Sequence, residues 1–196
     1  SMLAAERTLL NLLGRLSGVA STTRRFVTAI DGTGAVITDT RKTMPGLRLW
    51  DKYAVLVGGG TLHRLGLHDA ALFKDNHLAG IEPEALGPRL TEACRIARER
   101  PGLKFVEVEV DTLEQLDVVL GLESGLVDIV LLDNMDSATM REAVTRRDLS
   151  GRSIALEASG GIELDSAFEV ASSGVDRIAI GALTRLATIM DIGLDL

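Results

Sequence analysis

Residues 105–134, FVEVEVDTLEQLDVVLGLESGLVDIVLLDN, decide the fold. An apolar run at 105–110 precedes a segment with apolar residues every three or four positions, 112–121, and a second apolar run follows at 129–132. Short apolar runs of this kind are typical of buried parallel strands, and the segment between them has the period of an amphipathic helix. A strand, a helix and a strand in this order predict a right-handed βαβ unit in a parallel sheet.

The same alternation extends toward both ends of the chain. Apolar runs predict strands at 35–38, 70–73, 105–110, 129–132, 154–156 and 177–180. Apolar periodicity predicts helices at 3–30, 83–100, 112–121 and 163–173. Six such units favour an α/β fold, an open (β/α) TIM-like barrel of six to seven parallel strands. A flat doubly wound sheet is the alternative, and no G-x-G-x-x-G follows the first strand to support a dinucleotide version of it.

Local signals refine these boundaries. Thr112 and Asp136 are expected to cap helices at their amino ends, and Gly174 to follow a helix at its carboxyl end. Residues 46–57 could form a helix or a strand, and the opening helix could be broken near Gly18.

Composition narrows the class of protein. The chain has 196 residues, enough for one domain, and its net charge of −7 argues against nucleic acid or an anionic membrane as partner. No apolar run approaches the roughly 18 residues that span a bilayer. The single Cys94 excludes an internal disulfide and suggests a reducing, cytoplasmic setting. Residues 1–77 nevertheless carry 10 Lys/Arg against 6 Asp/Glu, which suggests a local site for a small anion.

Polar residues follow or close the predicted strands, at the barrel face where active sites are built. They are Asp39-Thr-Arg41-Lys42, Lys74-Asp75-Asn76-His77, Glu107 with Glu109, Asp133-Asn134, Glu157-Ala-Ser159-Gly160-Gly161 and Gly181-Ala182. Glu107 and Glu109 share one face of their strand, where buried carboxylates need partners. An ion pair inside the barrel, such as Lys74 with Glu109, is the structural alternative to a functional role.

The cations and the carboxylates divide by position. Cations come from the first strand ends and a glycine-rich loop: Arg41, Lys42, His63, Arg64 and Lys74. Arginine binds carboxylates in a bidentate fork, so this group predicts a substrate with more than one carboxylate. Glu109 and Asp133 suit ribose hydroxyls or Mg²⁺.

The last strand ends carry glycines. Ser159-Gly160-Gly161 and Gly181-Ala182 stand where barrels often bind phosphate. His68 is expected in a surface loop and His77 in a structural role, and no histidine spacing suggests zinc.

These residues occur in order within longer motifs. The motifs are ERT at 6–8, LSG at 16–18, DTRKTMPGLR at 39–48, KYAV at 52–55, GGG at 58–60, HR at 63–64, KDNH at 74–77, EVEV at 107–110, LLDN at 131–134, SGG at 159–161, GALT at 181–184 and DIG at 191–193. Together they resemble the nicotinate-nucleotide pyrophosphorylase (carboxylating) family, also called quinolinate phosphoribosyltransferase. The resemblance covers essentially the whole chain.

The resemblance implies an activity, a fold and a set of ligands. The activity is the conversion of quinolinate and phosphoribosyl pyrophosphate to nicotinate mononucleotide, pyrophosphate and CO₂, with Mg²⁺. Residues 3–196 would be the barrel domain, and the family's amino-terminal α/β sandwich domain would be absent. A homodimer or higher homo-oligomer is implied, with active sites shared between subunits.

The resemblance also implies residue roles, which are as follows. Quinolinate would be bound by Arg41, His63, Arg64 and Lys74, together with Arg7 from the partner subunit. Lys42 would lie near the pyrophosphate or ribose, and the ribose hydroxyls and Mg²⁺ would be held by Glu109 and Asp133. The 5′-phosphate would be bound by Ser159, Gly160, Gly161, Gly181 and Ala182. Lys42, Lys74, Glu109 and Asp133 are the expected catalytic group.

Two positions depart from the family pattern. Leu62 replaces an asparagine before the His-Arg pair, and Arg185 replaces a histidine after Ala-Leu-Thr. Three alternatives stay open: a truncated barrel that binds anions or assembles without catalysis, a related molybdenum-transport-associated homologue, and another phosphate-binding barrel enzyme such as an isomerase or aldolase.

Overall fold

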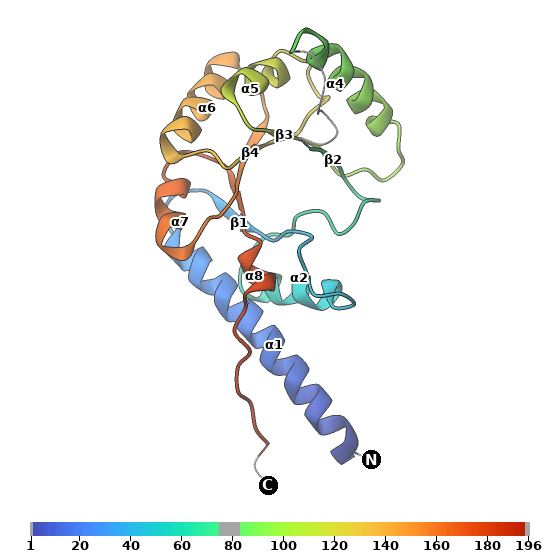
Figure 1. Ribbon diagram of the computed structural model, residues 1–196, viewed down its shortest axis with the longest axis vertical. Helices are drawn as coiled ribbons and strands as arrows, with labels where there is room; N and C mark the ends of the chain where they lie inside the picture. Colours follow the sequence, from blue (N-terminus) through green and yellow to red (C-terminus); the bar gives the residue numbers. More distant parts are fainter. Residues whose placement is uncertain (1, 75–82, 195–196) are drawn as a thin grey trace.

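The computed structural model describes residues 2–74 and 83–194, and within them six parallel strands curve into an open barrel (Figure 1). The strands are β1 (Val36–Thr38), β2 (Ala71–Phe73), β3 (Val106–Val110), β4 (Ile129–Asp133), β5 (Ala155–Ser159) and β6 (Arg177–Ala179). Their order is β1-β6-β5-β4-β3-β2, so β1 and β2 form the two edges. Each predicted strand is present within two or three residues of its expected bounds, and the barrel prediction is confirmed over the flat sheet.

Strand register separates the interior of the barrel from its outer layer. Glu109 pairs with Leu131, Leu131 with Glu157 and Glu157 with Arg177, so these four side chains form one inward-facing row. The residues between them on the strands, such as Val108, face outward and are fully buried under the helices. The core therefore lies between strands and helices, and the barrel interior is largely polar.

Four helices cover the outside of β2 to β6 (Figure 1): α4 (Pro83–Arg98), α5 (Leu113–Leu120), α6 (Ser137–Ser150) and α7 (Leu164–Ala171). Both predicted amino-terminal caps are confirmed, because Thr112 accepts the N–H of Gln115 and Asp136 accepts the N–H of Thr139. Apolar periodicity does not predict α6, because only Met140 and Ala143 of this helix are buried.

Aspartates before two strands fasten the amino ends of the barrel. Asp128 accepts the N–H of Val106 on the neighbouring strand and pairs with Arg98 of α4. Asp176 repeats the arrangement with the N–H of Leu156 and with Arg147 of α6. These contacts lie opposite the strand ends that carry the predicted site residues.

The remaining helices lie beside β1. Residues 46–57, which could be helix or strand, contain α2 (Arg48–Val57), and the short α8 (Ala182–Arg185) follows β6. The long α1 (Met2–Ala29) projects beyond the barrel, with the carboxyl-terminal segment running along it (Figure 1). The option of a break in the helix at Gly18 was wrong. A Cβ at Gly18 would lie 1.8 Å from the carbonyl oxygen of Thr188, so this glycine admits the crossing segment instead.

In the described part of the chain, no helix combines the length and apolar character needed to cross a membrane.

We expect Gly18→Ala to destabilise the fold. Glycine to alanine in a helix interior ordinarily stabilises by about 0.5–1 kcal/mol, but the backbone clash at Thr188 should reverse the sign and cost about 1–3 kcal/mol. Urea unfolding measures the difference. Gly87→Ala in α4 is the matched control, since its Cβ would meet only Val118 at 3.6 Å. Equal stabilisation of both variants would contradict the packing of the carboxyl-terminal segment on α1.

Candidate active site

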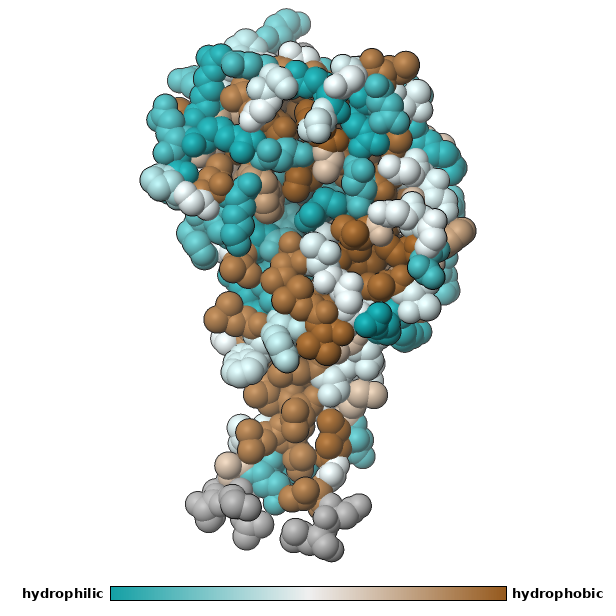
Figure 2. Space-filling view, turned by 180° about the vertical axis from the view of Figure 1, so that it is seen from behind, coloured by the Kyte–Doolittle hydropathy of each residue, from teal (hydrophilic) through white to brown (hydrophobic). Residues whose placement is uncertain are grey.

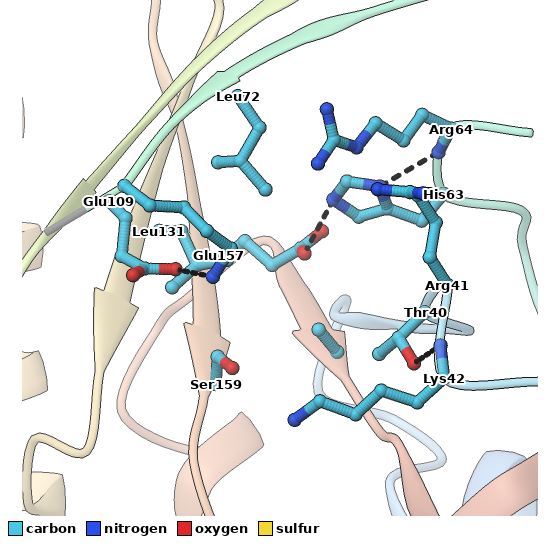
Figure 3. Close-up of a pocket in the computed structure, with 12 residues that line it drawn as sticks. Thr40, Arg41, Lys42, His63, Arg64, Leu72, Glu109, Leu131, Glu157 and Ser159 are labelled. Atoms are coloured by element: carbon cyan, nitrogen blue, oxygen red, sulfur yellow. Dashed lines mark hydrogen bonds and ion pairs between the residues drawn. The ribbon is translucent and has the colours of Figure 1, made fainter. Parts of the chain in front are cut away.

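A cavity opens at the carboxyl ends of the strands (Figure 3). It encloses about 530 Å³ of empty space, part of it open to solvent. Its lining consists of Thr40, Arg41, Lys42, His63, Arg64, Leu72, Lys74, Glu109, Leu131, Glu157, Ser159 and Ala179. Most come from inward-facing strand positions or the loops directly after them, so the barrel itself sets their spacing.

Two guanidinium groups lie on one side of this cavity (Figure 3). Arg64 is buried and donates from Nη1 to the carbonyl oxygen of Ala70 at 3.3 Å. Burial, and after it the positive charge of Arg41, lower the pKa of Arg64. The Nε of Arg41 is buried and has no hydrogen-bond partner among the described residues. Both arginines can therefore donate hydrogen bonds to an anionic ligand.

A buried ion pair fixes the loops that carry these arginines. Asp39 accepts the Lys52 Nζ at 2.5 Å through one oxygen and the backbone N–H of His63 at 2.8 Å through the other. Both Asp39 and Lys52 are almost completely buried. One carboxylate thus joins the end of β1, helix α2 and the loop before Arg64.

His63 turns its ring toward the barrel interior. Its Nε2 lies 2.8 Å from Glu107 and 3.3 Å from Glu157, and neither carboxylate is exposed. An N–H shared between two acceptors aligns well with neither, which explains why Oε2 of Glu107 and Oε1 of Glu157 lack well-directed hydrogen bonds. Glu157 also accepts Arg177 Nε at 2.6 Å.

These contacts shift the protonation of the cluster. Burial alone lowers the pKa of His63, but its contacts with Glu107 and Glu157 and their charges raise it to about 9. Burial raises the pKa of Glu107, and the charge of Glu157 acts in the same direction. Burial also raises the pKa of Glu157, yet His63 and Arg177 outweigh it and hold the pKa below its usual value. The cluster therefore retains a proton at neutral pH.

The position of that proton argues against a metal ion. Ligand atoms of His63, Glu107 and Glu157 lie within 4.8 Å of one another, close enough to coordinate a cation. The backbone N–H of Arg64, however, donates to Nδ1 of His63 at 2.7 Å. The ring proton must then sit on Nε2, the atom that would need a free lone pair to bind metal.

Of the two predicted carboxylates, Glu109 lines the opposite side of the cavity and Asp133 lies at a strand end beside it. Glu109 pairs with Lys74 at 2.5 Å, which confirms the ion pair considered from the sequence. Asp133 accepts Asn134 Nδ2 at 2.6 Å at the end of the neighbouring strand. Asn134 has φ of 52°, and it is the single described non-glycine residue with positive φ. A Cβ at Gly160 would come 2.2 Å from its side-chain oxygen, so Asn134 and the loop after β5 fit closely together.

The glycine loops complete this end of the barrel. Gly160 and Gly161 have φ of 104° and 54°, a region that favours glycine. Gly181 precedes α8, where a Cβ would lie 3.3 Å from the Lys42 side chain. Within the described ranges, the N–H groups of Gly160, Gly161 and Gly181 donate to no acceptor.

The structure gathers most of the residues predicted from sequence. Those lining the cavity are Arg41, Lys42, His63, Arg64, Lys74, Glu109 and Ser159. Asp133, Gly160, Gly161, Gly181 and Ala182 lie at strand ends beside it. Arg7 is different, since it lies on the projecting part of α1 beside Ile189–Ile192. His68 is exposed, as expected, and the predictions for Asp75, Asn76 and His77 fall outside the described residues.

Glu157 is the residue whose role sequence reasoning missed. Its position in the sequence marks it as a polar residue near a strand end and indicates no function. The available signal was its parity with Ser159, two residues further on, which places both side chains on the inner face of β5.

We expect Glu157 and Arg177 to be strongly coupled in stability. Glu157→Gln and Arg177→Met should each cost about 3–5 kcal/mol, because each breaks an ion pair whose carboxylate is completely buried. The double variant should lose less than the sum of the two, by about 0.5–3 kcal/mol. Urea unfolding of the four proteins measures this coupling. Arg98→Met, at a more exposed pair, should cost only about 0–1 kcal/mol. Additive losses would show that the interior pair is not coupled.

Comparison with known proteins identifies a family for the chain. Residues 19–195 match the family model described as quinolinate phosphoribosyl transferase, C-terminal domain. The carboxylating nicotinate-nucleotide pyrophosphorylase of Mycobacterium leprae is 49% identical over all of this chain and 66% of its own length. A probable enzyme of the same name from Bacillus subtilis is 42% identical, over 100% of this chain and 64% of its own.

Solved structures agree with the sequence relatives. The nicotinate-nucleotide pyrophosphorylase from Francisella tularensis superposes with a TM-score of 0.84 at 39% identity, covering 97% of this chain and 63% of that one. The enzyme from Ehrlichia chaffeensis gives 0.82 at 37% identity, covering 96% and 65%. The chain thus spans slightly less than two thirds of the length of these four relatives.

Proposed function

The chain belongs to the quinolinate phosphoribosyl transferase family, and from this premise we propose that its cavity joins quinolinate to the phosphoribosyl group of phosphoribosyl pyrophosphate. The products would be nicotinate mononucleotide, pyrophosphate and CO₂. The observation that carries the proposal is the pair Arg41 and Arg64, which bring two guanidinium groups into one cavity and have no carboxylate partner within residues 2–74 and 83–194.

A flat dicarboxylate suits this lining. Two guanidinium groups can each bind one carboxylate in bidentate fashion. The same lining includes the apolar side chains of Leu72, Leu131 and Ala179, which can contact the faces of an aromatic ring. Such a ring would bury apolar surface while its two carboxylates replace the water around the arginines.

The carboxylates and the glycine loops suit the second substrate. Glu109, which lines the cavity, can accept ribose hydroxyl groups. The unbonded N–H groups after β5 and β6, together with Lys42, can bind phosphate oxygens. This arrangement would hold the anomeric carbon between the two anion-binding regions.

Mg²⁺ fits the same end of the cavity as part of the proposal. Glu109 and Asp133 provide oxygen ligands at the ends of adjacent strands, and Mg²⁺ is typically held by one or two carboxylates plus substrate phosphates and water. When bound, the ion would offset negative charge on the departing pyrophosphate.

The reaction then needs two bond exchanges. The ring nitrogen forms a bond to the anomeric carbon as the bond to pyrophosphate breaks, and the negative side chains stabilise the positive charge that develops on the ribose. The adjacent carboxylate leaves as CO₂, its bonding electrons remain on the ring carbon, and that carbon takes up a proton. Holding both carboxylates with Arg41 and Arg64 fixes the ring nitrogen toward the ribose.

A second copy of the chain is part of the proposal. Apolar side chains gather on the stalk formed by α1 and the carboxyl-terminal segment (Figure 2). The most exposed ones there and on α2 are Leu9, Leu13, Leu49, Trp50, Tyr53, Leu56, Val57, Leu186, Ile189 and Leu194. A surface of this kind marks an interface. A homodimer would cover it and could carry Arg7 of one copy to the cavity of the other.

The direct test is product formation. We expect nicotinate mononucleotide, detected by mass spectrometry, when the chain is mixed with quinolinate, phosphoribosyl pyrophosphate and Mg²⁺. Nicotinate in place of quinolinate, or omission of Mg²⁺, should abolish it. A folded chain that forms no product would refute activity of this barrel by itself, and the same assay with an amino-terminal domain from a relative would test whether that domain restores it.

A second test measures quinolinate binding by variants of Arg41. Arg41→Ala should weaken quinolinate binding by about 2–5 kcal/mol, because a desolvated charge pair is broken. Arg41→Lys keeps the charge but loses the bidentate geometry, so its quinolinate affinity should lie between those of the wild type and Arg41→Ala. Calorimetric affinity unchanged in Arg41→Ala would remove this residue from the proposed site.

Mixing two inactive variants tests the shared site. Arg7→Ala and Arg41→Ala should each lose activity, whereas an equimolar mixture that exchanges subunits should recover up to about a quarter of it. In a two-fold dimer, half of the molecules would be mixed and each would have one intact site. A mixture as inactive as its components, with subunit exchange verified by sedimentation of tagged chains, would mean that Arg7 does not act across an interface.

A further inference from the structure

The buried pair Asp39–Lys52 lies below the cavity and takes no part in lining it. Asp39 is not exposed at all and Lys52 is exposed by 1%. A buried ion pair is weak evidence for stability, since apolar side chains of the same size often serve as well or better. Its presence in this place calls for another explanation.

The contacts of Asp39 connect the two arginine-bearing segments. Its Oδ1 accepts the N–H of His63, directly before Arg64, and its backbone N–H donates to Thr61. Arg41 follows Asp39 by two residues. The distance between the two guanidinium groups therefore depends on a single carboxylate.

Lys52 sets the position of that carboxylate from the other side. Its ammonium group contacts Asp39 at 2.5 Å and the carbonyl oxygen of His63 at 3.4 Å. The preceding residue, Asp51, binds Arg15 of α1 through two hydrogen bonds and accepts the N–H of Met44. Helix α2 is thereby held against α1, and the Lys52 side chain extends from this fixed helix to the Asp39 carboxylate.

We propose that Asp39 and Lys52 are positioning residues that set the spacing of Arg41 and Arg64, and thereby select a substrate with two carboxylates over one with a single carboxylate. The inference rests on the proposed function, because it assigns both arginines to one dicarboxylate. Two guanidinium groups at a fixed separation bind both carboxylates of one ligand at once. If their separation varies, they bind the carboxylates one at a time.

The test is a charge-free replacement of the pair. In Asp39→Asn with Lys52→Met both charges are removed together, the volume is nearly kept, and the asparagine oxygen can still accept the N–H of His63. Such replacements are often neutral for stability, so the double variant is expected to fold. Circular dichroism and urea unfolding verify this before binding is measured.

Binding is measured by calorimetry with quinolinate, nicotinate and phosphoribosyl pyrophosphate with Mg²⁺. We expect the double variant to lose at least tenfold in quinolinate affinity, with nicotinate and phosphoribosyl pyrophosphate changed less than threefold. Equal losses for all three ligands would indicate general damage and overturn the proposal, as would unchanged quinolinate affinity. If the double variant does not fold, Lys52→Arg, which keeps the charge, must show the same selective loss or the proposal fails.

The control removes a more exposed ion pair at the other end of the barrel. Asp176→Asn with Arg147→Met also deletes an aspartate that accepts a backbone N–H and its basic partner. This variant should keep the wild-type preference for two carboxylates, and a loss equal to that of the test variant would overturn the proposal. If the wild-type protein binds no quinolinate, the proposed function itself is refuted. If the wild-type protein binds quinolinate and the double variant binds it equally well, only the positioning role of Asp39 and Lys52 is refuted.

Discussion

The contact between Glu157 and Arg177 is the constraint on which the barrel interior depends. Glu157 is completely buried, and its carboxylate also meets Thr38 of β1 and His63 of the loop before β2. It therefore ties the two edges of the open sheet to the middle strands. Because a charge in this position requires opposite charges and hydrogen bonds around it, the interior of the barrel becomes polar. A polar interior in turn leaves room for a cavity where an apolar one would fill with side chains.

The division between this interior and the outer core follows from the two-residue period of strands. The V-E-V-E-V segment of β3 places three valines under the helices and two glutamates inside. Sequence reasoning could recover this division, along with all six strands and the cavity face, because each depends on neighbouring residues in one strand. It also placed Arg41, Arg64 and Glu109 at this face, where they line the cavity, since parallel strands bring their carboxyl ends to one side.

What sequence reasoning did not reach depends on contacts between distant segments. Helix α6 buries only Met140 and Ala143, so its position on the barrel leaves too weak a pattern to recognise. Gly18 suggested a break, whereas its lack of a side chain admits residue 188, far along the chain. Glu157 received no role because its partners lie on β6, β1 and a loop. Each failure concerns a residue explained by its tertiary neighbour rather than by its neighbours in sequence.

The cations of the cavity differ in how free they are to meet a ligand. Arg64 donates to a carbonyl oxygen and the Nε of Arg41 has no partner, so an anionic ligand would break no ion pair of either arginine among the residues that the structure describes. Lys74 is already paired with Glu109, and a ligand that draws Lys74 away leaves that carboxylate free for hydroxyl groups or a cation. An anion that drew Lys74 away would therefore change the charge available at Glu109. A chain with net charge −7 can in this way present a positive pocket whose carboxylates become available when the pocket is filled.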